Sequence, residues 1–302
     1  MADEVRGKQI INLSDMTRDS VRSLGKELSG VNSDGNKKLI LDHVFSFVGL
    51  SGGVGTSTII ANVASELTKM GRSVIIIDLN IMYPIQHSFF KLKQELETKD
   101  LCSFLGGEAT LGECIKYPAG RDLGILIANN RGIVEHIDAD SKDGSNALTE
   151  CLERLSSLFD FVLIDCSNRL ENELINTALY KSDRIMAILD ENLEGLSNYN
   201  RLCSAMGACG IDYMRVKTIL NKRTSIQYNR SILKDFNIDL IQVLPFELGI
   251  IESGLKGEIY CRKGASTSKT ASAFVQGIKN IARSMERLSG STADDEKEEA
   301  NK

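Results

Sequence analysis

The hydrophobic residues of this chain form short unbroken runs that alternate with longer segments of helical periodicity. One such run ends at Leu50, and the next covers Val74 to Ile77. Unbroken apolar runs of this length are typical of strands buried on both faces of a parallel sheet. The pattern predicts strands over the ranges 44–50, 73–79, 123–128, 159–165, 183–190, 215–221 and 239–243.

Between these runs, apolar residues recur every three or four positions, as they do along one face of a helix. The segment 268–288 has apolar residues at 274, 275, 278, 281, 282, 285 and 288, which predicts a helix docked on the sheet. Helices are predicted near 56–70, 86–97, 144–158, 170–181, 193–208, 226–236, 248–254 and 268–288. Strands that alternate with helices predict an α/β fold, a doubly wound, mainly parallel sheet of about seven strands with helices on both faces.

The two ends of the chain differ from this regular pattern. Residues 1–43 contain a short apolar stretch, a helix N-cap signal and a polar linker at 31–38, so we expect an N-terminal arm with a short helix. Residues 289–302 carry five acidic and two basic residues and predict a disordered acidic tail. A single α/β domain is therefore expected over 44–288.

A glycine-rich turn lies between the first predicted strand and the first predicted helix. It reads Ser51-Gly52-Gly53-Val54-Gly55-Thr56-Ser57-Thr58. Glycines let consecutive backbone N–H groups turn inward on a phosphate, and the helix N-terminus adds its dipole. The order of strand, glycine loop and helix is the context of a phosphate-binding loop, which outweighs the alternative of a simple tight connection.

This loop lacks the lysine that a standard phosphate-binding loop places before its Ser/Thr pair. Thr56 occupies that position. A charge-assisted bond between lysine and phosphate contributes roughly 1.5–3 kcal/mol, and more in a transition state that gathers negative charge. The loop is therefore expected to hold a nucleotide and to cleave it poorly.

The loop resembles the deviant Walker A motif of the MinD/ParA family of P-loop ATPases, Lys-Gly-Gly-x-Gly-Lys-[Ser/Thr]-[Ser/Thr]. Ser51 stands at the signature lysine and Thr56 at the general P-loop lysine. The wording of the loop is most similar to the CpaE/TadZ branch, which places pilus secretion machinery at a cell pole. The matching positions are Gly52, Gly53, Gly55, Ser57 and Thr58.

The resemblance implies a site for ATP or ADP with Mg²⁺. Backbone amides of the loop, Val54 and Thr56 included, are expected to bind the phosphates, with Thr58 near the α-phosphate. The Ser57 hydroxyl is expected to coordinate Mg²⁺. Asp78 and Asp165 end strands that resemble the entries to the two switch regions of the family, so both are expected to hold Mg²⁺, directly or through water.

Two later segments resemble the adenine site of the family. The strand VKTILN ends in Asn221, at the position whose amide reads adenine. Leu244-Pro245-Phe246 resembles the proline-containing loop beside the base. The resemblance therefore implies that Asn221, Pro245 and Phe246 contact the adenine ring.

Two other segments depart from the family pattern. The family's Asp-x-Asp reads Asp78-Leu79-Asn80 here, and an asparagine cannot accept a proton from an attacking water. The segment after Asp165 lacks the proline and glycine of the family's Asp-x-Pro-x-Gly, which argues against a switch driven by nucleotide. No catalytic residue is assigned, since Ser51, Thr56 and Asn80 are degenerate, and we expect a pseudo-ATPase or a very slow ATPase.

Composition excludes several other functions. The chain has no Trp and a formal net charge of −5, so it offers neither base-stacking platforms nor a general basic surface for specific nucleic-acid binding. Neither a signal peptide nor a membrane-spanning run is found. Seven cysteines without a CxxC pair predict free thiols in a cytoplasmic protein. The three histidines, His43, His87 and His136, are isolated and expected to be structural.

The expected function is a dimeric, nucleotide-binding positioning scaffold, located at a cell pole through a protein partner in a pilus assembly or secretion machine. With Ser51 in place of the signature lysine, the homodimer is expected to depend little on ATP. One alternative is an active ATPase for partitioning, cell division or organelle positioning, in which Lys222 or Lys256 replaces the missing lysine. The other is a P-loop kinase or reductase relative, which would need a tyrosine-rich tail or paired cluster cysteines.

Overall fold

The computed structural model describes residues 40–81, 83–92, 99–118, 120–128, 142–166, 172–208, 210–224, 236–262 and 268–289. The strands of these residues form one seven-stranded sheet in the order β3-β2-β4-β1-β5-β6-β7, with every neighbouring pair parallel. This confirms the predicted fold class. The strands are β1 (Leu41–Gly49), β2 (Val74–Asp78), β3 (Leu123–Leu126), β4 (Phe161–Cys166), β5 (Ser182–Leu189), β6 (Val216–Arg223) and β7 (Leu240–Pro245).

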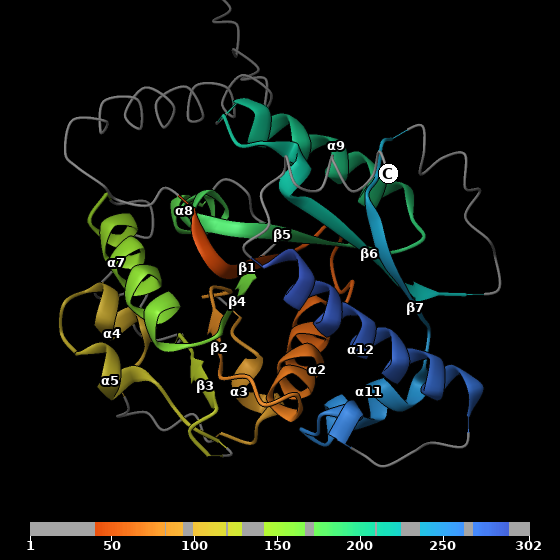
Figure 1. Ribbon diagram of the computed structural model, residues 1–302, viewed down its shortest axis with the longest axis horizontal. Coiled ribbons are helices and arrows are strands. Elements are labelled where there is room, and N and C mark those ends of the chain that lie inside the picture. Colours follow the sequence, from red (N-terminus) through yellow and green to blue (C-terminus); the bar gives the residue numbers. More distant parts are fainter. Residues whose placement is uncertain are drawn as a thin grey trace, which may run out of the picture.

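Helices cover both faces of the sheet, as Figure 1 shows. Side chains of α7, α8 and α9 pack on one face, and those of α2 and α12 pack on the other. The helices are α2 (Thr56–Lys69), α3 (Gln86–Phe89), α4 (Leu101–Leu105), α5 (Leu111–Cys114), α7 (Lys142–Leu158), α8 (Glu173–Lys181), α9 (Leu193–Ala208), α11 (Leu248–Leu255) and α12 (Lys269–Leu288). Two 3₁₀ turns, η1 (Tyr213–Arg215) and η2 (Tyr260–Arg262), complete the described elements.

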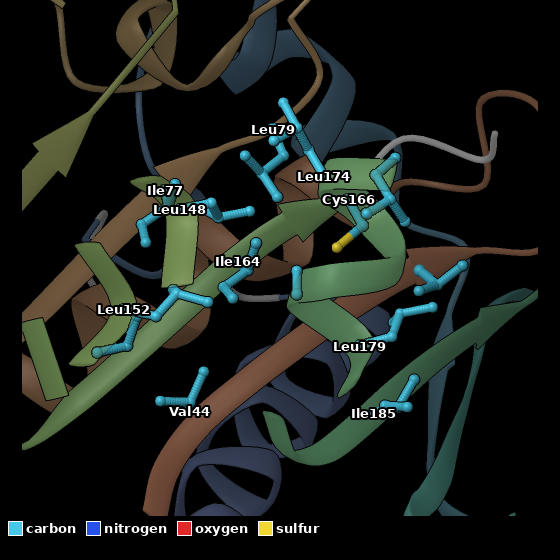
Figure 2. Close-up of a cluster of buried hydrophobic side chains, with 14 of the residues drawn as sticks. Val44, Ile77, Leu79, Leu148, Leu152, Ile164, Cys166, Leu174, Leu179 and Ile185 are labelled. Atoms are coloured by element: carbon cyan, nitrogen blue, oxygen red, sulfur yellow. The ribbon is translucent and has the colours of Figure 1, made fainter. Parts of the chain in front are cut away.

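The central strand β1 explains why the apolar runs of the sequence are nearly continuous. Val44 and Val48 point into the core beneath α7 and α8, whereas Phe45 and Phe47 point into the core beneath α2 and α12. Successive side chains of a strand face opposite sides of a sheet, so a strand covered on both sides is apolar at most positions. The buried Ser46 interrupts the run, and its hydroxyl is hydrogen-bonded to that of Ser182 at 2.7 Å. Figure 2 shows the first core, where helical leucines such as Leu148 lie over the strand residues.

The C-terminal helix α12 docks as its apolar stripe predicts. Its buried residues Phe274, Ile278 and Ile281 join the core that contains α2 and the strand residues of that face. Ser268 caps the helix by accepting a hydrogen bond from the backbone N–H of Ala271. A helix docked through its whole apolar face stabilises the edge of the sheet near β7.

The structure corrects the sequence prediction at a few element boundaries. Strand β1 begins at Leu41 rather than at 44. The helix predicted over 86–97 ends at Phe89, because Lys91 adopts a left-handed φ of 54°, which does not continue a helix. The short helices α4 and α5 were not predicted, since four or five residues are too few to show a periodicity.

Several predictions lie outside the described residues. They are the short helix in the N-terminal arm, the helix at 226–236 apart from Phe236, the environment of His136, and the acidic tail beyond Ser289. Of the helices in the described ranges, none is both long and apolar enough to cross a membrane.

Candidate functional site at the carboxyl ends of the strands

The phosphate-loop candidate Ser51–Thr58 joins β1 to α2 at the carboxyl edge of the sheet. Gly53 and Gly55 have φ values of 68° and 101°, which L-residues with a side chain rarely adopt. A Cβ atom on Gly55 would also lie 2.6 Å from the Nδ2 atom of Asn221. The loop conformation therefore requires glycine at position 55 for both backbone and space.

The N-terminus of α2 opens directly onto this loop. Its N-cap residue is Gly55, which provides no side-chain oxygen to the first N–H groups of the helix. Uncapped N–H groups at a helix start carry partial positive charge and are suited to bind an anion. The loop thus has the backbone geometry of a phosphate site without any side-chain charge of its own.

Strand β5, the residue that follows it and helix α9 hold the start of the loop. The Leu50 N–H donates to the Ile188 carbonyl at 2.9 Å, and the Asn198 amide donates to the Leu50 carbonyl at 2.7 Å. Ser51 is buried, and its hydroxyl donates to Asp190 Oδ1 at 2.8 Å. The first position of the loop is therefore occupied by a small side chain that faces a carboxylate.

The end of β6 holds the middle of the loop. Asn221 Nδ2 donates to the Val54 carbonyl at 2.8 Å, and the Lys222 ammonium donates to the Gly53 carbonyl at 2.5 Å. The pairing of β6 with β7 shifts register between Leu220 and Arg223. Because of this irregularity, two consecutive side chains reach the same loop, where a regular strand would point them in opposite directions.

Asp78 and Asp165 form a buried carboxylate pair beside the loop. They end the neighbouring strands β2 and β4 and are direct partners in the parallel register. Burial raises the pKa of both carboxyl groups, and the charge of Asp165 raises the pKa of Asp78 further. Hydrogen bonds from Gln86 and Ser57 oppose this increase in the pKa of Asp165. Two adjacent buried carboxylates favour a proton or a cation between them.

The two carboxylates have different partners. Asp78 accepts hydrogen bonds from three backbone N–H groups, those of Asn80 (3.1 Å), Ile85 (2.9 Å) and Gln86 (3.0 Å). It therefore holds the segment that follows β2 in a compact turn. Asp165 accepts a side-chain hydrogen bond at 2.6 Å from Gln86 Nε2. Asp165 can exchange this side-chain partner without unfolding a backbone turn, whereas Asp78 cannot.

Gln86 links the carboxylate pair to the phosphate loop. Its side chain is fully buried, and its Nε2 atom donates both to Asp165 and to the Ser57 carbonyl, the latter at 3.1 Å. Its Oε1 atom is buried and has no hydrogen-bond partner within the described residues. An orphaned buried oxygen destabilises a site unless a ligand, water or ion satisfies it. The donor set of Ser57, Asp165 and Gln86 Oε1 fits Mg²⁺, which prefers oxygen ligands.

The remaining predicted site residues lie at the same edge. The Thr56 side chain lies over Gly49, where an added Cβ would meet Thr56 Oγ1 at 2.6 Å. The Thr58 carbonyl accepts a hydrogen bond from Asn62 inside α2. Pro245 ends β7 opposite Arg223, and Phe246 follows it with 42% of its surface exposed. The structure thus places the loop, both carboxylates, Asn221 and Pro245 at the carboxyl ends of their strands.

Sequence reasoning missed Gln86 and Asp190. Gln86 carries no motif, and its burial beside Asp165 depends on the turn that Asp78 organises. Asp190 directly follows β5, so its place at the ligand-binding edge of a doubly wound sheet was a usable signal.

The thiols and histidines show no second site. None of the described cysteines forms a disulfide; they are Cys102, Cys114, Cys151, Cys166, Cys203 and Cys261. Across the described ranges, no three His, Cys, Asp or Glu residues gather as a potential metal cluster. The evident ligand chemistry of the described chain is therefore that of the phosphate loop and its carboxylates.

Comparisons with known proteins agree with this fold. A family model described as an AAA domain matches residues 42–207, more than half of the chain. A septum site-determining protein MinD from Synechocystis sp. is 26% identical over 243 residues, which cover 78% of this chain and 86% of that protein.

Solved structures show the same fold. MinD complexed with Mg-ADP from Pyrococcus horikoshii has a TM-score of 0.68 at 20% identity and covers 82% of this chain and 99% of its own. The MinC:MinD cell division protein complex from Aquifex aeolicus gives a TM-score of 0.67 at 18% identity, covering 83% and 98%. The chain belongs to the AAA-domain family, as a member of its MinD/ParA group of P-loop ATPases.

Proposed function

We propose that this chain is a MinD/ParA-like positioning protein with a deviant, degenerate Walker A loop, which binds ATP or ADP with Mg²⁺ and hydrolyses ATP little or not at all. One observation carries the proposal. The loop keeps the backbone shape of a phosphate site, with left-handed Gly53 and Gly55 and an uncapped α2 N-terminus, while Ser51 and Thr56 carry no charge. The backbone shape of the loop supports nucleotide binding, and the absence of the two lysine charges limits the rate of ATP hydrolysis.

Nucleotide binding would use the backbone first. The amides from Gly53 to Ser57 and the α2 dipole would hold the phosphates. Asn221, Pro245 and Phe246 stand at the adjacent ends of β6 and β7, on the side proposed for adenine. Asn221 already donates to the Val54 carbonyl, so it would connect the base side of the site to the phosphate loop.

Magnesium would be held by Ser57 and, directly or through water, by Asp165, with Asp78 as a supporting carboxylate. When bound, the ion neutralises phosphate charge. The orphaned Gln86 Oε1 and the raised pKa values of Asp78 and Asp165 both indicate a place where added positive charge is stabilised. The three backbone hydrogen bonds on Asp78 make it the residue that organises the turn, and Asp165 the residue free to serve the ion.

Weak hydrolysis follows from three substitutions at this edge. Thr56 and Ser51 cannot stabilise charge that develops on the γ-phosphate, and the Ser51 hydroxyl is turned toward Asp190. Asn80 cannot act as a base toward water. Each loss is expected to lower the rate by about one decade or more, which together puts turnover near background.

The biological role that we propose is polar placement of a pilus assembly or secretion machine, as in the CpaE/TadZ branch. The protein would act in the cytoplasm as a homodimer with a protein partner, without specific nucleic-acid binding. The relative in the MinC:MinD complex illustrates a protein partner of this fold. Since Ser51 cannot reach a partner's phosphate, the dimer would rest on surface packing and form without ATP.

Calorimetry and sedimentation test this proposal together. Wild-type protein titrated with ATP and ADP, with and without Mg²⁺, should bind both nucleotides, and more tightly with Mg²⁺. Sedimentation should give the same dimer with and without ATP. Absence of any nucleotide binding at millimolar ligand would reduce the loop to a structural turn, and a dimer formed only with ATP would contradict the packing model.

One observation favours the alternative of an active ATPase. A lysine from outside the loop, Lys222, does reach the loop backbone. Phosphate release that persists through extensive purification and disappears in Gly55→Asp would favour the active enzyme over the scaffold.

A further inference from the structure

Lys222 has an unusual backbone conformation. Its φ of 55° lies in the left-handed region, which non-glycine residues adopt at an energetic cost. It follows Asn221 at the irregular end of β6, where the pairing with β7 shifts register. Strained residues persist where the surrounding structure holds them, and they gather at ligand sites.

This conformation directs the Lys222 side chain at the phosphate loop. Its ammonium donates to the Gly53 carbonyl at 2.5 Å, while the preceding Asn221 holds the Val54 carbonyl at 2.8 Å. Both contacts are to backbone oxygens of consecutive loop residues. The end of β6 therefore holds the loop through the Asn221 amide and the Lys222 ammonium.

The Lys222 ammonium contacts a neutral group on the loop. Within the described part of the chain, the ion pairs do not involve Lys222, and its contact on the loop is with a neutral carbonyl. Among the described side chains of the loop, that of Ser51 donates to an acid, Asp190. The Lys222 ammonium at the end of β6 brings a positive charge to the phosphate loop.

We propose that Lys222 is the phosphate-contacting cation of this site and replaces, from another strand, the lysine that the loop lacks at Thr56. The inference rests on the proposed nucleotide binding. The ligand class is a nucleoside di- or triphosphate. The flexible four-carbon stem of lysine and its three donors allow the ammonium to exchange the Gly53 carbonyl for a phosphate oxygen.

The location of Lys222 also explains how a nucleotide can be bound without rapid cleavage. A lysine at position 56 would belong to the phosphate loop itself, whereas Lys222 reaches the loop from the end of β6 through the Gly53 carbonyl. In this proposal the Lys222 ammonium would stabilise the bound and the reacting phosphate to similar extents. Such uniform binding strengthens affinity without accelerating the chemical step.

The test compares Lys222→Gly with Lys222→Arg. Glycine tolerates the left-handed backbone at position 222, so Lys222→Gly removes the ammonium without adding strain. Arginine keeps the charge and the same backbone demand. The matched control is Arg223→Ala, which removes one positive charge from the next, exposed position. Thermal unfolding of the ligand-free variants checks that the fold is intact.

The readout is calorimetric affinity for ATP, ADP and adenosine with Mg²⁺, at about 50 and about 300 mM salt. Lys222→Gly should weaken ATP binding about tenfold, leave adenosine binding unchanged, and flatten the salt dependence. Lys222→Arg should restore most of the affinity, and Arg223→Ala should change it less than about threefold.

Three results would overturn the inference while wild-type binding stands. They are unchanged ATP affinity in Lys222→Gly, an equal loss for adenosine, which would indicate a purely structural contact, and an equal loss in Arg223→Ala, which would indicate a general charge effect. If the wild-type chain binds no nucleotide at all, the proposed function fails and this inference fails with it.

Discussion

The phosphate loop after β1 and the carboxylate pair after β2 and β4 are neighbours at one edge of the sheet, and they are built in different ways. The loop depends on backbone, with glycines in left-handed conformations and an uncapped helix start. The pair depends on side chains, with Asp78, Asp165 and Gln86 buried together. Phosphate binding by backbone N–H groups is retained when side chains change, whereas catalysis that depends on charged side chains is lost. Under the proposed function, this difference would let the chain keep a nucleotide site and lose turnover.

The largest expected effect comes from a substitution that disrupts the backbone of the phosphate loop. Gly55→Asp should abolish ATP and ADP binding, a loss of at least about two decades in affinity. The new side chain would be strained at a φ of 101°, would meet Asn221 at 2.6 Å and would place a carboxylate where phosphate binds. Calorimetry measures the effect.

Gly52→Ala is the matched control for that substitution. A Cβ added at Gly52 would meet open space, and the residue has no left-handed φ, so the loop should keep its shape and its affinity. Equal loss of binding in both variants would show that the loop shape at Gly55 is not what binds the nucleotide.

A second test restores positively charged side chains to the phosphate loop. Ser51→Lys combined with Thr56→Lys should raise the ATPase rate by about tenfold or more, since both lysines would place positive charge beside the phosphates. Ser51→Met with Thr56→Met supplies similar length without charge and should stay at the wild-type rate. A single-turnover phosphate assay distinguishes the two. Equal rates in both double variants would mean that charge at the loop is not what limits hydrolysis.

The carboxylate pair makes stability depend on pH. Burial raises the folded-state pKa of both carboxyl groups, and the charge of Asp165 raises the pKa of Asp78 further. Above about pH 4 the folded protein therefore binds more protons than the unfolded chain, and this contribution to stability is lost as pH rises through the raised pKa values.

Asp165→Asn should remove much of this dependence. It deletes one charge, keeps an oxygen that can accept from Gln86, and lets the pKa of Asp78 fall toward its usual range. Urea unfolding at about pH 5 and about pH 8 should show a smaller difference than in the wild type. Asp122→Asn, at an exposed position, is the control. A pH dependence in Asp165→Asn as steep as in the wild type would contradict the coupling of the two carboxylates.

The smallest expected effect concerns the acid beside the loop. Asp190 accepts from the Ser51 hydroxyl at 2.8 Å and so places negative charge near the phosphate site. Asp190→Asn keeps an acceptor for Ser51 and should tighten ATP binding by about two- to fivefold, with the gain shrinking in high salt. If the ATP affinity of Asp190→Asn measured by calorimetry is unchanged or weaker, the Asp190 carboxylate does not repel the bound phosphates.

The sequence predicted the fold well because its strands are covered on both sides. The mostly apolar run in β1 and the stripe in α12 each reflect a surface that must be buried, so period and composition were sufficient. The helices α4 and α5 were too short for periodicity, although Thr110 and Glu113 form a capping box that could have marked α5.

The site was predictable where backbone defines it and less so where distant side chains meet. The glycines of the loop are visible as a motif. The contacts of Lys222 with Gly53 and of Gln86 with Asp165 depend on an irregular strand end and on a turn, which leave no periodic signal. From the sequence, Lys222 was one of two alternative replacements for the missing lysine. The tertiary structure shows that its side chain contacts the phosphate loop.

The most direct test of the account measures binding and turnover on one preparation of wild-type protein. Calorimetry should show Mg²⁺-assisted ATP binding, and a phosphate-release assay on the same sample at saturating ATP should stay at the background of the Gly55→Asp variant. Robust wild-type phosphate release that is absent from Gly55→Asp would contradict the account, because it would show that the altered loop still supports hydrolysis.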